Sequence, residues 1–147
     1  MIGGNKRIMQ IALRCSVILS VIIQVLLPYH AQGQRNKRAP ENFKYPESPN
    51  IFQVDKVIKS KSLSGTISYP GGAGMPDALV EKLESNWGRR VEAILTDSKG
   101  YFIFTGVAPE IYFLKVSKPG FDSVRFKVEV TTKKSSSRLK IVLSLST

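Results

Sequence analysis

The chain has 147 residues, a net charge of +11 from 22 Lys or Arg against 11 Asp or Glu, and 42% apolar residues. This length and apolar content suit one domain with a packed core, and the single cysteine excludes an internal disulfide. The basic excess favours anionic surfaces without specifying one.

The N-terminal segment has the layout of a secretory signal. Two basic residues precede an apolar run from Cys15 to Leu27, and residues 31–33 place small side chains around a cleavage site after Gly33. We predict that residues 1–33 are a signal peptide and that the protein is secreted or periplasmic. The alternative is an uncleaved membrane anchor, because residues 8–27 almost span a hydrocarbon core of about 30 Å. Membrane contact is expected only in that case.

Cleavage after Gly33 would remove Cys15 and His30, the only cysteine and histidine. The mature chain then has no Ser-His-Asp or Cys-His nucleophile and no His or Cys metal site. We therefore predict that the protein is not an enzyme and uses no cofactor or metal. A glycosidase-like carboxylate pair or a calcium loop is not indicated either, because each candidate acid has a simpler place in a turn or on a strand: Asp77, Glu81, Glu84 and Asp97.

Residues 34–61 form a predicted basic, Pro-rich linker. The part from Gln34 to Asn50 carries prolines and charges without apolar periodicity, which predicts a disordered or extended, solvated tether. Phe43 and Tyr45 could alternatively make a sticky patch for a polymer or membrane surface. Residues 51–58 are more apolar and could form a lead-in strand or a pad against the domain.

From Ser62 to Thr147 the apolar residues alternate with polar ones, which is typical of strands with one face in a core. A helix competes only over residues 75–86. The last two runs flank a polar turn, so they are expected to be neighbouring antiparallel strands. The fold class is therefore all-β, a sandwich of about seven antiparallel strands, at 63–69, 78–83, 90–96, 101–105, 111–118, 124–130 and 139–145.

One turn has a clear physical signature. In Asp97-Ser98-Lys99-Gly100 the aspartate can bond its own backbone and the glycine can adopt a positive φ, which predicts a tight hairpin. Beyond it, Phe102 and Phe104 lie on one face of a strand. We expect them to pack in the core against Tyr112 and Leu114.

The order of these motifs resembles the carboxypeptidase regulatory-like domain, over about residues 63–145. The resemblance is carried by Leu63-Ser64-Gly65-Thr66-Ile67, by Thr96 to Phe104, and by Gly106 to Val116. It implies a transthyretin-like (prealbumin-like) seven-stranded sandwich of the carbohydrate-binding-like fold, used as an add-on domain and without a catalytic set. Ile111 departs from the glycine that the family usually has there, so its turn is expected to be built differently.

The candidate ligand site is the loop with the only tryptophan, Trp87, followed by Arg89 and Arg90. Trp can stack on a sugar, and Arg can pair with a carboxylate or phosphate. In the favoured alternative, Trp87 caps the core and the arginines are solvated. The leading function is a non-enzymatic exported accessory module that contacts an envelope or extracellular protein, and polysaccharide binding through the Trp87 loop is the alternative. Nucleic acid is not expected as a partner.

Overall fold

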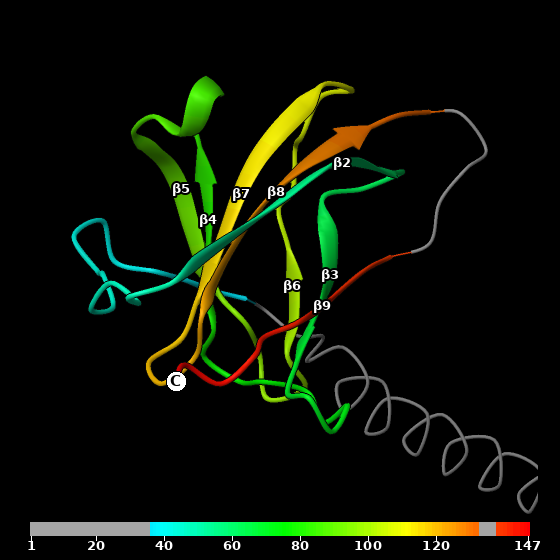
Figure 1. The fold of residues 1–147 in the computed structure, drawn as a ribbon. Helices are drawn as coiled ribbons and strands as arrows, with labels where there is room; N and C mark the ends of the chain where they lie inside the picture. Colours follow the sequence, from blue (N-terminus) through cyan, green and yellow to red (C-terminus); the bar gives the residue numbers. More distant parts are fainter. Residues whose placement is uncertain (1–35, 133–137) are drawn as a thin grey trace, which may run out of the picture. The chain divides into compact units, whose positions relative to one another are not determined.

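The computed structural model describes residues 36–132 and 138–147, which form two packed sheets (Figure 1). The large sheet has the strand order β1-β5-β4-β7-β8-β2, and the small sheet has the order β6-β3-β9. The strands are β1 (Lys37–Arg38), β2 (Ile51–Ser60), β3 (Ser64–Ser68), β4 (Leu79–Leu83), β5 (Arg90–Leu95), β6 (Tyr101–Ile103), β7 (Ile111–Ser117), β8 (Ser123–Val130) and β9 (Leu139–Val142), with a short 3-10 turn, η1 (Ser85–Trp87). The all-β sandwich fold class is thus confirmed.

The N-terminal predictions fall outside this description. The predicted signal peptide, its cleavage site after Gly33, Cys15 and His30 all lie before residue 36. Within the described ranges, no helix is both long and apolar enough to cross a membrane.

The seven strands predicted after Ser62 are β3 to β9. Residues 79–83 form β4 rather than a helix, because their side chains alternate between two faces: Val80 points into the main core, whereas Leu79 packs in a separate small cluster on the other face. η1 then leaves the strand with Asn86 and Trp87 at positive φ values of 58° and 63°, which ends any regular structure there.

The core lies between the inner faces of the two sheets. Phe102 and Leu63 from the small-sheet side and Leu114 and Phe126 from the large sheet are at most 1% exposed. Phe104 and Tyr112 belong to the same cluster, so the predicted packing of these aromatics with Leu114 is confirmed. Burying such a side chain stabilises the fold by about 1.5–3 kcal/mol.

The predicted pairing of the last two strands is wrong. β8 pairs with β7 and β2 in the large sheet, whereas β9 lies in the small sheet, parallel to β3. The sandwich is therefore antiparallel except for the β2–β8 and β3–β9 pairs. Alternation shows which side chains point inward, but both strands point apolar residues into the same core from opposite sides, so the pattern does not reveal the change of sheet.

The turn at Asp97–Gly100 has the predicted chemistry but a different role. The Asp97 carboxylate Oδ1 accepts backbone hydrogen bonds from Lys99 and Tyr101, both at 2.9 Å, and Gly100 has a φ of +74°. However, the turn joins β5 of the large sheet to β6 of the small sheet, so it is a corner of the sandwich and not a hairpin.

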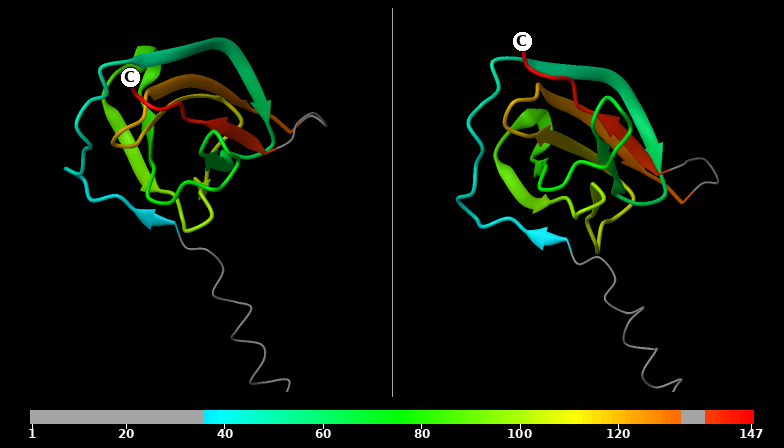
Figure 2. Two further views of the ribbon diagram at one scale, coloured as in Figure 1. Left: turned by 60° about the horizontal axis from the view of Figure 1, so that its bottom comes forward. Right: turned by 90° about the horizontal axis from the view of Figure 1, so that it is seen from below.

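The segment before residue 62 contributes strands to the large sheet. Residues 51–60 form β2, which confirms the expected lead-in strand, and β2 completes one edge of the large sheet. The segment before it is not a free tether from residue 36 onward: β1 pairs with β5, and Ala39 is 8% exposed. Figure 2 shows this cyan segment passing along the side of the domain before it enters β2.

We predict that Gly100→Ala destabilises the domain by more than about 2 kcal/mol, because strain and overpacking add. A Cβ at Gly100 would lie 2.1 Å from the Ile67 carbonyl oxygen and 2.6 Å from the Met75 nitrogen. Gly106→Ala is the matched control, since Gly106 also has a positive φ, of +67°, but a Cβ there meets nothing within 4 Å. Denaturant unfolding of both variants measures the difference, and equal losses would contradict the close packing of Gly100.

Candidate functional site

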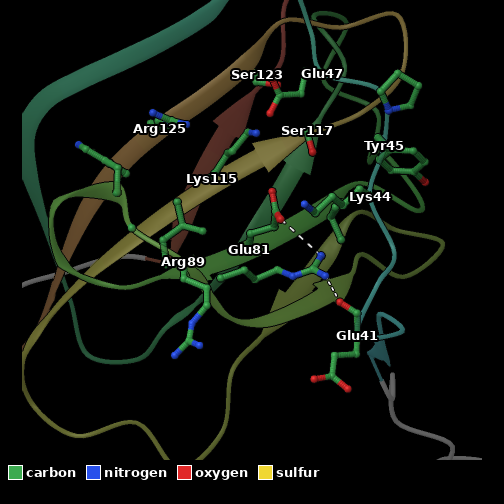
Figure 3. Close-up of a pocket in the computed structure, with 16 residues that line it drawn as sticks. Glu41, Lys44, Tyr45, Glu47, Glu81, Arg89, Lys115, Ser117, Ser123 and Arg125 are labelled. Atoms are coloured by element: carbon green, nitrogen blue, oxygen red, sulfur yellow. Dashed lines mark hydrogen bonds and ion pairs between the residues drawn. The ribbon is translucent and has the colours of Figure 1, made fainter.

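A polar trough lies on the outer face of the large sheet, with a volume of about 450 Å³ (Figure 3). Its floor is formed by outward side chains of β4, β7 and β8, including Glu81, Lys115 and Arg125. Trp87 is also among the residues that line it. Part of its wall is formed by residues 39–47, a segment we call the strap.

The strap covers an apolar part of the same sheet face. Ala39 packs with Leu79 and Ala93, and Phe43 and Tyr45 lie against this small cluster. Phe43 and Tyr45 also contact each other edge to face, with ring centroids 5.0 Å apart. The prediction that these aromatics belong to a solvated tether is therefore wrong, because the apolar outer side chains of β4 and β5 give them a surface on which to pack.

Arg90 anchors the strap to the sheet. Its guanidinium donates to the carbonyl oxygens of Glu41 and Phe43 and lies 3.4 Å from the Glu81 carboxylate, contacts drawn as dashed lines at Glu41 and Glu81 in Figure 3. The side chains of Arg90 and Glu81 are 15% and 10% exposed. Arg90 is thus a structural cation whose donors are engaged by the protein itself.

Tyr45 holds the far end of the strap. Its hydroxyl donates to the Asp77 carbonyl oxygen at 2.8 Å, and Lys118 donates to the same oxygen at 3.3 Å. Burial, reinforced by the negative charge of Asp77, raises the pKa of Tyr45 above its ordinary value of 10.0. The phenol therefore stays protonated, and able to donate, throughout the neutral pH range.

The three predicted site residues all line the trough, but in different roles. Trp87 packs edge to face on Phe113, at 5.1 Å between ring centroids, and the Arg125 guanidinium lies 5.7 Å from the Trp87 ring. The Arg89 side chain is 85% exposed and pairs with Glu84 at 3.1 Å. Trp87 is half-buried, between the two alternatives set out from the sequence, and ligand binding by these residues stays a prediction.

Sequence reasoning missed Lys115 and Arg125. The sequence indicated that both are outward-facing, because each stands at a polar position of an alternating strand and therefore lies on the outer face of its sheet. What the alternation did not reveal is that β7 and β8 are neighbours, which places Lys115 directly opposite Arg125.

The four carboxylates considered in the sequence analysis do not come together in one site. Glu81 and Glu84 pair with arginines, Asp97 shapes its turn, and Asp77 occupies a loop at a φ of +53°. Among the described residues, no group of three or more His, Cys, Asp or Glu side chains is placed to hold a metal ion. Ile111 begins β7 with a 52% exposed side chain, and the preceding loop takes its positive φ at Gly106 instead.

Arg90→Gln should destabilise the domain by about 2–4 kcal/mol, because it leaves the nearly buried Glu81 carboxylate without its ion pair. Arg89→Gln is the matched control and should change stability by less than about 0.5 kcal/mol, since that pair is exposed. Urea unfolding, with hydrogen exchange of residues 39–47, measures both effects. Unchanged exchange of the strap in Arg90→Gln would refute the anchoring role.

A family model described as the carboxypeptidase regulatory-like domain matches residues 62–144, which span β3 to β9. No curated protein matches the chain. Among solved structures, the crystal structure of 3-chlorocatechol 1,2-dioxygenase from Rhodococcus opacus 1CP is similar over 82% of this chain and 77% of that chain. The two sequences are 12% identical, and the TM-score is 0.39. Because the family match covers more than half of the sequence and the fold agrees with it, this chain belongs to the carboxypeptidase regulatory-like domain family.

Proposed function

We propose that the protein is a non-enzymatic, exported accessory module that acts by contacting an envelope or extracellular protein. The secretory layout of the first 33 residues supports export. Membership of a regulatory-like domain family supports an accessory role. The observation that carries the proposal is the exposed apolar edge formed by the first part of β2.

β2 is the last strand of the large sheet and pairs with β8 alone among the described strands. Ile51, Phe52 and Val54 are 41%, 56% and 39% exposed. Since Phe52 and Val54 stand opposite Val124 and Phe126, they lie on the core-facing side of the sheet. They remain exposed because the sheet opposite has half as many strands.

The edge is open only in its first half. Residues 51–54 pair with β8 in regular register, whereas an irregularity separates Val54 from Ile58. Asp55, Lys56 and Lys59 add charges in the second half, and bulges and charges are the usual means by which edge strands resist pairing. A partner strand added along residues 51–54 could bond the free main-chain groups there and cover Phe52 and Val54.

A photo-crosslinking side chain at position 52 should yield a discrete adduct with one protein in cells that produce this chain naturally. The same group at Val91, a 58% exposed apolar position on β5, is the matched control and should yield no such adduct. Val54→Lys should abolish the adduct at position 52. Equal labelling from both positions, or an adduct that survives Val54→Lys, would contradict the proposed edge.

Polysaccharide binding through the Trp87 loop remains the second candidate, supported by the half-buried Trp87 among the residues that line the trough. Retention of the protein on neutral polysaccharides should then fall about tenfold in Trp87→Ala, since loss of one stacking platform removes about 1–3 kcal/mol by analogy with base stacking. The matched control is Tyr101→Ala, which removes an aromatic side chain of β6 in the small sheet. Equal retention of wild type and Trp87→Ala would exclude this site.

A further inference from the structure

We infer that the outer face of β7 and β8, around Lys115 and Arg125, binds the carboxylate groups of an acidic polysaccharide. This site goes beyond the protein contact proposed for the β2 edge and lies on another surface of the sheet. It shares the trough with Trp87, Arg89 and Arg90, but the side chains that would bind the ligand are Lys115 and Arg125.

Two neighbouring basic side chains lie on the floor of the trough. Lys115 and Arg125 stand opposite each other in the β7–β8 ladder, where Cβ atoms are about 4.5–5.5 Å apart and like charges destabilise a sheet. Neither side chain has an ion pair among the described residues. Glu81 is in register with Lys115 on its other side, but that carboxylate lies 3.4 Å from Arg90. Within residues 36–132 and 138–147, these two adjacent cations at the floor of the trough therefore form no ion pair.

The Arg125 side chain is partly buried and is held in place by its neighbours. Its Nε is buried and has no hydrogen-bond partner within residues 36–132 and 138–147, an arrangement that costs about 1–3 kcal/mol. The Trp87 ring, 5.7 Å from the guanidinium carbon, fixes the position of this side chain. A planar carboxylate can bond the two terminal Nη groups of a guanidinium at once, which leaves the buried Nε out of the contact but neutralises the charge of the pair.

The surroundings favour a sugar polymer over a peptide. The trough lies on the face of the sheet, where the main-chain groups of β4, β7 and β8 are already paired in ladders, so a peptide could not add a strand there. Beside these cations, the exposed strap residues Glu41, Lys44 and Glu47 line the trough and supply carboxylate acceptors and an ammonium donor. Such mixed donors and acceptors match the hydroxyl groups of a sugar.

The test uses the full chain and polygalacturonate, a polymer of sugar carboxylates, with neutral dextran and poly-glutamate as comparison polymers. Lys115→Gln with Arg125→Gln should weaken polygalacturonate binding at least about tenfold, because two charge-assisted contacts are lost. Arg138→Gln with Lys140→Gln removes the same charge from the β9 side of the small sheet and should weaken binding less than about twofold. Dextran should not bind.

The folding of both double variants is checked by urea unfolding, and the site variant should stay within about 1 kcal/mol of the wild type, because removal of the like-charge pair offsets the lost Arg125–Trp87 contact. Equal weakening by both double variants, or equal binding of poly-glutamate, would show general attraction of polyanions and overturn the site. Absence of polygalacturonate binding would overturn it too. None of these results bears on the cross-linking of β2, so the two proposals fail separately.

Discussion

The apolar interface between two sheets of unequal width is the constraint on which the rest of the structure depends. Three small-sheet strands pack on a sheet of six, and the side chains buried between them, such as Phe102, Leu114 and Phe126, form one continuous cluster. Sheets pack about 10 Å apart with interdigitating side chains. Large-sheet strands that the small sheet does not reach must therefore be covered by another part of the chain or remain exposed. The surfaces available for binding follow from that mismatch.

The chain covers one of these surfaces and leaves another open. On the outer face, the strap places Phe43 and Tyr45 over the apolar side chains of β4 and β5, and Arg90 ties its main chain to Glu81. What remains beside the strap is the polar trough. At the opposite edge, nothing in the described residues pairs with the free side of β2, and the narrow small sheet leaves Phe52 56% exposed.

The sequence was sufficient for the properties that depend on local alternation. Strands such as Val124 to Val130 show their inward face in the period of two, and Asp97 and Gly100 show their turn through their own backbone chemistry. Sheet membership was not predictable, because β8 and β9 bury similar residues in one core from opposite sides. The strap was missed for a related reason: two aromatics among prolines and charges have no periodicity, and their partners, Leu79 and Ala93, lie far along the chain.

The residues of the candidate site could also be predicted only in part from the sequence. Trp87 was found because it is the only tryptophan, and Arg89 and Arg90 because they follow it. Arg89 is solvated and pairs only with the nearby Glu84, whereas Arg90 holds the strap through Glu41 and Phe43, which lie more than 40 positions away in the sequence. Lys115 and Arg125 become a pair only through the β7–β8 register, which depends on the whole core.

The central claim is that β2 is docked on the large sheet yet uncovered along its free side, and residue-resolved amide hydrogen exchange of the full chain tests it most directly. Along residues 51–54, amides that face β8 should be protected, and the alternate amides that face outward should exchange rapidly. Protection of all four amides would mean that the edge is covered, and protection of none would mean that β2 is not part of the sheet. Either result would contradict the account.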